Sequence, residues 1–176
     1  MLSRNLTSSE IALTTTLFKD SINYSLVKVH DHVFVEFQPD NSGMTPNGEI
    51  FASKGAYRKD YGVETPDFKA FFLHEMTHIW QYQNNILHVK TSAILETLYQ
   101  LGDYDKAYFY MLDNDKGLIE YGIEQQASIV QDYYLVVKCG LNFSDRVQNG
   151  GTKSDKKNLL KRVMGDFITD PKMSVR

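Results

Sequence analysis

The architecture of this chain depends most on residues 65 to 83, which read TPDFKAFFLHEMTHIWQYQ. Thr65-Pro66-Asp67 is a typical helix start, with a threonine as N-cap, proline at the first helical position and an acid in the first turn. Neither proline nor glycine interrupts residues 67–83, and Asn84-Asn85 follows as a stop. The sequence therefore predicts one long helix over residues 67–83.

The middle of this helix carries the motif His74-Glu75-Met76-Thr77-His78. Two histidines four positions apart are separated by about 40° around a helix axis, so both imidazoles can reach one zinc ion at about 2.0–2.1 Å. Glu75 points about 100° away and cannot readily join them, but it can reach a water in the open position of the metal. The motif is typical of a hydrolytic zinc site, with His74 and His78 as ligands and Glu75 as general base.

The residues around the motif carry no charge, which distinguishes this helix from a solvated one. A helix that faced water would show Lys and Glu among these positions. We therefore favour a helix beneath a cleft with its ligands facing the metal, and a chance pair of histidines on a packed or solvated helix is the alternative. The uncharged positions are Phe71, Phe72, Leu73, Met76, Thr77, Ile79 and Trp80.

Zinc needs a further protein ligand, and we expect it from a second long helix over about residues 118–138. Glu124 and Ala127 on this helix form a Glu-x-x-Ala pattern. The small alanine one turn after the acid would let the two helices approach closely enough for a carboxylate to reach the metal. Glu124 is therefore the predicted third ligand, with Glu120 and His88 as alternatives.

Two other residues of the second helix are candidates to support the site. Asp132 falls eight residues after Glu124 on roughly the same face, so its carboxylate could accept the second ring N–H of His74 or His78 and fix the tautomer. An ordinary surface aspartate is the alternative. Tyr121 could donate a hydrogen bond to the oxyanion of a tetrahedral intermediate, and a tyrosine of the core or the rim is the alternative there.

The rest of the chain favours an α+β fold in a single domain over residues 1–176, because no repeat or linker appears. A small mixed sheet would pack on the motif helix and on the second, ligand-bearing helix. Tyr108 to Leu112 is compatible with either a strand or a loop. The expected elements are a helix over 7–18 with a capping box at Thr7 and Glu10, strands within 27–37 and over 49–52, a helix over about 91–100, and a last helix with an apolar face at Leu159, Leu160, Val163 and Phe167.

Composition excludes several classes of function. The net charge is −3 and the basic residues gather only within 153–162, where a solvated helix face explains them, so no nucleic-acid partner is expected. No apolar run approaches the about 18 residues of a membrane span. The N-terminus lacks a signal-peptide profile, so we expect a cytoplasmic location in the producing cell. The single Cys139 excludes an internal disulfide framework and a Cys-type zinc site.

Three segments together resemble a known family. HEMTHIWQ at 74–81, followed by IEQQASIVQDY at 123–133, resembles the zincin metallopeptidases of the glutamate-ligand type. More narrowly, these segments are similar to the zincin domains at the C-termini of VgrG-type spike proteins and in related stand-alone proteins of type VI secretion. MTPNGEI at 44–50 is similar to the strand that precedes the motif helix in that group.

The resemblance implies a zincin-like metallopeptidase fold, a Zn²⁺ site of His74, His78 and Glu124, and Glu75 as the catalytic base. It also implies an effector toxin that is secreted by a type VI system without a signal peptide. Its partners would be a protein or peptide substrate, a secretion spike protein and a cognate immunity protein.

We therefore expect a zinc-dependent metallopeptidase that hydrolyses peptide bonds through a zinc-bound water, with Glu75 as general base. Two alternatives stay open. The first is a non-catalytic zincin-like binding module, in which the metal ties two helices together and a fourth protein ligand closes the site. The second is an intracellular regulatory protease that cleaves a specific partner.

Overall fold

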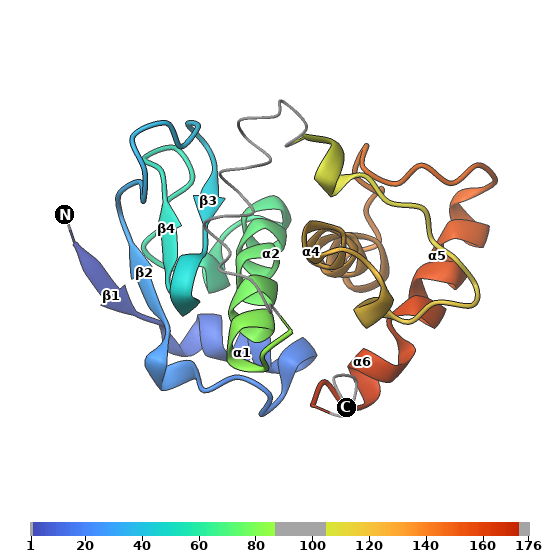
Figure 1. Ribbon diagram of the computed structural model, residues 1–176, viewed down its shortest axis with the longest axis horizontal. Coiled ribbons are helices and arrows are strands. Elements are labelled where there is room, and N and C mark those ends of the chain that lie inside the picture. The colour runs from blue at the N-terminus through green and yellow to red at the C-terminus, as the bar shows by residue number, and fades with distance from the viewer. Residues whose placement is uncertain (1, 87–104, 173–176) are drawn as a thin grey trace.

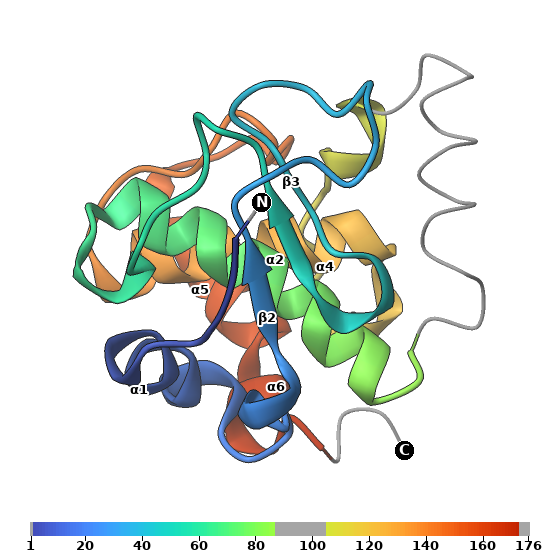
Figure 2. The same cartoon turned by 90° about the vertical axis from the view of Figure 1, so that its left-hand side faces the viewer.

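The computed structural model describes residues 2–86 and 105–172. Helix α2 (Pro66–Gln83) lies at the centre, with the sheet on one side of it and α4 (Ile123–Asp132) on the other (Figure 1). Figure 2 shows the sheet in front of α2, as it appears from the sheet side. The predicted α+β class with a small mixed sheet is confirmed, whereas α4 lies on the far side of α2 from the sheet.

The sheet has four short strands, β1 (Ser3–Asn5), β2 (Lys28–His30), β3 (Gly43–Met44) and β4 (Ile50–Ala52). Their order is β1-β2-β4-β3, and the sheet is mixed because only β2 and β4 run parallel. The predicted strand over residues 49–52 is confirmed as β4. Strand β3 ends the row, and the residues around it form one wall of the site described below.

The strand prediction for residues 33–37 is wrong. The chain turns there, with the Gln38 backbone N–H donating to Val35 O and the Phe34 N–H donating to the Gln38 side chain. The Gln38 amide also donates to the carbonyls of Ser42 and Phe51, so one buried side chain replaces the pairing that a strand would have made. Alternation of apolar residues does not distinguish a strand from such a loop.

Helix α2 follows the predicted bounds closely, with Thr65 at its N-cap and Asn84 at its C-cap. Its central residues are buried on nearly every side, because the sheet, α4 and the terminal helices all pack against it. Burial of a large apolar side chain such as Phe72 or Trp80 stabilises the fold by about 1.5–3 kcal/mol. The motif is therefore held on a helix whose central residues are deeply buried.

Helix α1 (Ser8–Phe18) starts at the predicted capping box of Thr7 and Glu10. The predicted last helix is divided at Met164 into α5 (Lys153–Val163) and α6 (Gly165–Thr169). The ring of Phe167 on α6 packs edge-on against Phe18 on α1 and Trp80 on α2. The two ends of the described chain are thus joined through the core beneath the motif helix.

The second ligand-bearing helix is shorter than predicted. Residues Leu118–Glu120 form a separate 3₁₀ turn, Tyr121 is extended, and α4 begins only after Gly122. After α4 the backbone widens into a π-helix, Tyr133–Lys138, and leaves it through Gly140 at a φ of 72°. The late start places Glu124 in the first turn of α4, where the helix dipole favours a negative charge.

The helix predicted over about 91–100 lies outside the described residues. Of residues 108–112, which the sequence left undecided, Tyr108 ends a 3₁₀ helix (Asp105–Tyr108) and the others form a loop in which Tyr110 makes an isolated parallel bridge to Val147. No helix in the described part of the chain is both long enough and apolar enough to cross a membrane.

Candidate metal centre

Three predicted ligands meet between α2 and α4. The Nε2 atoms of His74 and His78 lie 3.4 and 3.3 Å from the same carboxylate oxygen, Oε2 of Glu124. All three side chains are buried, with exposed fractions of 5%, 5% and 7%. Among the described residues, these form the group of side chains whose donor atoms converge closely enough to hold one metal ion.

The spacing of these atoms fits zinc. Ligands at about 2.0–2.1 Å in a tetrahedral site lie about 3.3–3.4 Å from one another, because the edge of a tetrahedron is about 1.63 times the distance from its centre to a corner. Glu124 Oε2 has these distances to both imidazoles. The same oxygen is buried and has no hydrogen-bond partner, which is costly for a carboxylate unless a cation satisfies it. Two nitrogens and one oxygen are also a donor set that zinc accepts.

The charges of the three groups are strongly coupled. Burial lowers the pKa of His74, although the facing Glu124 carboxylate acts against it. Burial acts to lower the pKa of His78 as well, but the facing Glu124 carboxylate outweighs it and raises that pKa to about 9. Burial would raise the pKa of Glu124, but the charge of His78, with a smaller contribution from His74, holds it well below its usual value. Glu124 is therefore an ionised carboxylate, as a metal ligand must be.

Gln81 orients His78. Its Oε1 lies 2.8 Å from His78 Nδ1, while its Nε2 donates to Ile123 O at 3.0 Å and to Gln126 Oε1 at 2.9 Å. Because both hydrogens of the amide are used on α4, Oε1 must accept the Nδ1–H of His78. In the neutral ring this leaves the lone pair of Nε2 directed toward Glu124, which is the tautomer that a metal ligand requires.

Glu75 is held by residues near the sheet edge. The hydroxyl of Thr45 donates to Glu75 Oε2 at 2.6 Å, and both side chains are buried. A Cβ on Gly43 of β3 would lie 2.5 Å from Glu75 Oε1 and 2.8 Å from the Phe71 ring. Only glycine allows the strand to approach the carboxylate this closely, so β3 and Thr45 together fix where Glu75 points.

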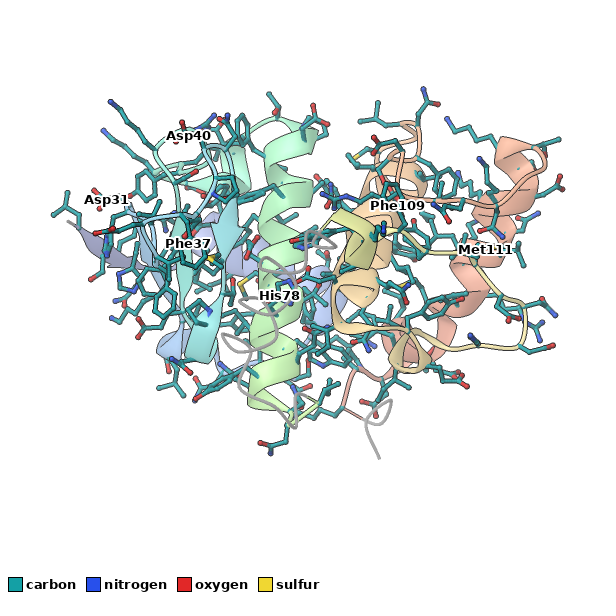
Figure 3. All side chains as sticks on the ribbon, turned by 45° about the horizontal axis from the view of Figure 1, so that its top comes forward. Asp31, Phe37, Asp40, His78, Phe109 and Met111 are labelled. Atoms are coloured by element: carbon teal, nitrogen blue, oxygen red, sulfur yellow. The ribbon has the colours of Figure 1, made fainter. Side chains whose placement is uncertain are left out.

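A cleft of about 520 Å³ opens over His74 and Glu75. Its wall on the sheet side is the loop from Pro39 to Gly43, and its opposite wall is formed by segments near α4. In Figure 3, Phe37 and Asp40 lie on the sheet side of α2, and Phe109 lies on the other side, beyond the helix that carries His78. The lining residues on the α4 side are Tyr108, Phe109, Gln131, Asp145 and Arg146.

Tyr108 lies against the metal centre within this cleft. Its ring stacks on the His74 ring, with 5.7 Å between the centroids and an angle of 26° between the planes. The guanidinium of Arg146 lies over Tyr108, 4.7 Å from the ring centroid. A ligand histidine, an aromatic ring and a cation thus follow one another along the α4 wall.

Asp132 and Tyr121 make their hydrogen bonds away from the histidines. The buried Asp132 carboxylate accepts the hydroxyl of Tyr110 and both the backbone N–H and the hydroxyl of Ser144, the latter two at 2.8 Å. The Tyr121 hydroxyl accepts the backbone N–H of Asp113 at 2.8 Å. The imidazole contact predicted for Asp132 is replaced by Gln81 on His78, because the loop that carries Ser144 folds over the end of α4.

Of the two alternative ligands, Glu120 and His88, only Glu120 lies in the described part of the chain. Glu120 is exposed in the 3₁₀ turn before α4, where its carboxylate accepts the Gly117 N–H at 2.7 Å. His88 lies outside the described residues. Sequence reasoning missed the supporting roles of Gly43, Thr45 and Gln81, although all three lie in or beside the segments that carried the resemblance.

No family model matches the chain. It is 38% identical over 134 residues to the type VI secretion system spike protein VgrG2b of Pseudomonas aeruginosa, and this match covers 75% of the chain but 13% of the spike protein. The fold is similar to the solved effector domain of P. aeruginosa VgrG2b, with a TM-score of 0.66 and 35% identity, covering 78% of this chain and 76% of that domain. The chain therefore belongs to the family of the VgrG2b effector domain.

Proposed function

We propose that this protein is a zinc-dependent metallopeptidase with a zincin-like fold, and that it acts as a type VI secretion effector. The observation that carries the enzymatic proposal is the position of Glu124 Oε2, at 3.4 and 3.3 Å from the two imidazole nitrogens of the motif helix. A carboxylate from a second helix at this spacing, with a further glutamate between the two histidines, is the donor set of a catalytic zinc site.

Each residue of the site has a separate task in this proposal. His74, His78 and Glu124 would hold the ion, and Gln81 keeps the His78 ring in the required tautomer. When bound, zinc would supply Lewis acidity, which acidifies a water and polarises the peptide carbonyl. Glu75 would accept a proton from the attacking water on its carboxylate and return it to the leaving amine. Thr45 holds that carboxylate through Oε2 during both transfers.

The number of ligands favours catalysis over a purely structural metal. Structural zinc sites usually have four protein ligands, whereas catalytic sites have three and keep one position open. The described residues offer three converging donors, and the cleft opens on His74 and Glu75. A fourth protein ligand would favour the binding-module alternative.

The effector proposal rests on the relatives. The solved relative is described as an effector domain, and the full-length relative is a spike protein of a type VI secretion system. We propose that this chain reaches its target through the same kind of system, in association with a spike protein, and that a cognate immunity protein protects the producing cell. Cleavage of a protein or peptide in the target would be its toxic activity.

The enzymatic proposal is tested by zinc content and hydrolysis measured on the same purified proteins. Wild type should bind one zinc per chain and cleave members of a broad peptide library. Glu124→Ala should lose most of the zinc and the cleavage, because two imidazoles alone bind weakly. Glu75→Gln should keep the zinc and lose the cleavage. Cleavage by Glu75→Gln at the wild-type rate, or a zinc-loaded wild type that cleaves no library member, would overturn the proposal.

The effector proposal has its own test. A tagged chain should appear in the medium of the producing bacterium only when its type VI system is functional. Expression in a susceptible cell should arrest growth with wild type and not with Glu75→Gln. Equal growth of the two strains would contradict a toxic role that depends on catalysis.

A further inference from the structure

Arg146 contributes the only lysine or arginine side chain among the described residues that line the cleft. Its Nη1 donates to Gln131 Oε1 at 3.0 Å and more weakly to Ser128 Oγ at 3.4 Å. Within the described residues, Nε and Nη2 make no hydrogen bond, and no carboxylate lies within 4.0 Å of the guanidinium. One edge of the guanidinium is therefore fixed, and the rest is available to a ligand in the cleft.

The backbone of Arg146 is held by the same network of hydrogen bonds that the Asp132 carboxylate accepts. Ser144 bonds to the Asp132 carboxylate, and the Tyr110 hydroxyl bonds to it as well. The Tyr110 backbone N–H then donates to Arg146 O at 3.0 Å. A buried carboxylate at the end of α4 thus ties together two loops, and these loops present Tyr108 and Arg146 to the cleft.

The position of Arg146 relative to the metal centre is also defined. Tyr108 touches both the His74 ring and the guanidinium, so Arg146 lies one aromatic ring away from a predicted zinc ligand. A group bound to Arg146 would be close to the bond that Glu75 helps to hydrolyse. Asp145 lines the same cleft, but it is exposed and forms no ion pair with Arg146 within 4.0 Å.

We propose that Arg146 forms a subsite for a carboxylate of the substrate beside the scissile bond. An arginine whose Nε and Nη2 make no hydrogen bond within the described residues can bind a carboxylate in a fixed, bidentate geometry. The substrate class is therefore an acidic peptide, in which the carboxylate belongs either to an Asp or Glu side chain or to the C-terminus. The inference rests on the proposed peptidase function and specifies its substrate.

The test measures binding, so that it does not depend on hydrolysis. Zinc-loaded Glu75→Gln protein is titrated with three pools of dye-labelled octapeptides that differ only in carrying Glu, Gln or Lys at the varied positions. A second set repeats the pools with amidated C-termini. We expect the Glu pool to bind at least about tenfold more tightly than the Gln pool, since a charge-assisted bidentate contact is lost. If the Glu and Gln pools bind equally and amidation weakens the binding of both, the carboxylate is that of the C-terminus.

Substitutions at Arg146, made in the Glu75→Gln background, connect the preference to this residue. Arg146→Ala should bind the Glu and Gln pools equally, and Arg146→Glu should prefer the Lys pool, which a damaged fold could not produce. Arg162→Ala is the matched control, because Arg162 donates to Asn114 O outside the cleft. Equal affinity of the parent protein for the Glu and Gln pools, with no loss of affinity on amidation, would overturn the proposal, as would a carboxylate preference that survives in Arg146→Ala. Failure of the peptidase function itself would appear separately, as absent cleavage by the zinc-loaded wild type.

Discussion

At the scale of single residues, the proposed activity depends on how the proposed general base is held. Glu75 is buried in the helix next to two predicted metal ligands, and Thr45 donates a hydrogen bond to its Oε2 at 2.6 Å. A hydrogen bond to a charged group contributes about 1.5–3 kcal/mol, enough to keep the carboxylate in one rotamer. The free oxygen can then serve in proton transfer without a search through other conformations.

Thr45→Val should therefore lower kcat about tenfold or more while zinc content stays unchanged. The substitution keeps the shape of the side chain and removes only the donor to Glu75. Thr45→Ser restores the hydroxyl and should recover most of the rate. Steady-state kinetics with metal analysis of each preparation checks this. An unchanged kcat in Thr45→Val would show that the contact does not position the base.

At the scale of elements, the geometry of the site depends on hydrogen bonds that join α2 to α4 in addition to the three candidate ligands. Gln81 on α2 is fully buried, and it bonds to His78 on its own helix and to Ile123 and Gln126 across the interface. The Gln81 amide thus sets the tautomer of His78 and the distance between α2 and α4, which carries Glu124.

Gln81→Ala should weaken zinc binding by about 10- to 100-fold, the usual effect of removing the partner of a ligand histidine. It should also lower stability by about 1–3 kcal/mol for each buried group that is left without a partner. Gln83→Ala on the same helix is the control, because Gln83 bonds instead to Asn23 at the surface. Competition titration with a zinc chelator and urea unfolding give the two quantities. Zinc affinity that is equal in the two variants would contradict this role.

The contact between β3 and α2 gives a second prediction at this scale. A methyl group on Gly43 would overlap Glu75 Oε1 and the Phe71 ring, so Gly43→Ala must push the strand or the carboxylate aside. We expect hydrolysis to fall by at least tenfold with zinc retained. Gly150→Ala is a fair control, because nothing lies within 4 Å of the added Cβ there. Full activity of Gly43→Ala would mean that the strand yields without disturbing the base.

The elements also show what the sequence could and could not predict. Helix α2 was predictable because its cap, its period and its motif are local. The start of α4 was not, because Gly122 and an extended Tyr121 interrupt a segment whose apolar pattern continues. Thr45 bonds to a residue 30 positions away, and Gln81 bonds to one 45 positions away on α4, so no local pattern reports these two contacts. Glu124 was predicted as a ligand from its spacing to Ala127, because a small residue one turn after the acid lets two helices pack closely.

At the scale of the whole molecule, the metal centre joins two halves of the fold. The sheet lies on one side of α2, whereas α4 and the π-helix lie on the other side with α5 (Figure 1). His74 and His78 belong to α2, and Glu124 belongs to the opposite half. Without a cation, the Glu124 oxygen is buried with no hydrogen-bond partner, so the interface is less favourable in the metal-free protein.

Removal of zinc should therefore lower the unfolding temperature of the entire chain. A ligand present at about 100 times its Kd stabilises the folded state by about 2.7 kcal/mol, which corresponds to roughly 5–11 °C for a chain of this size. Acid should have the same effect as a chelator, because imidazole binds zinc only when it is neutral. The unfolding temperature of Glu75→Gln should fall on chelation by as much as that of wild type, since this variant keeps all three ligands. Glu124→Ala should show little change, because it has little zinc to lose. Calorimetry with and without chelator compares the three proteins, and an equal shift in wild type and Glu124→Ala would mean that the metal binds elsewhere.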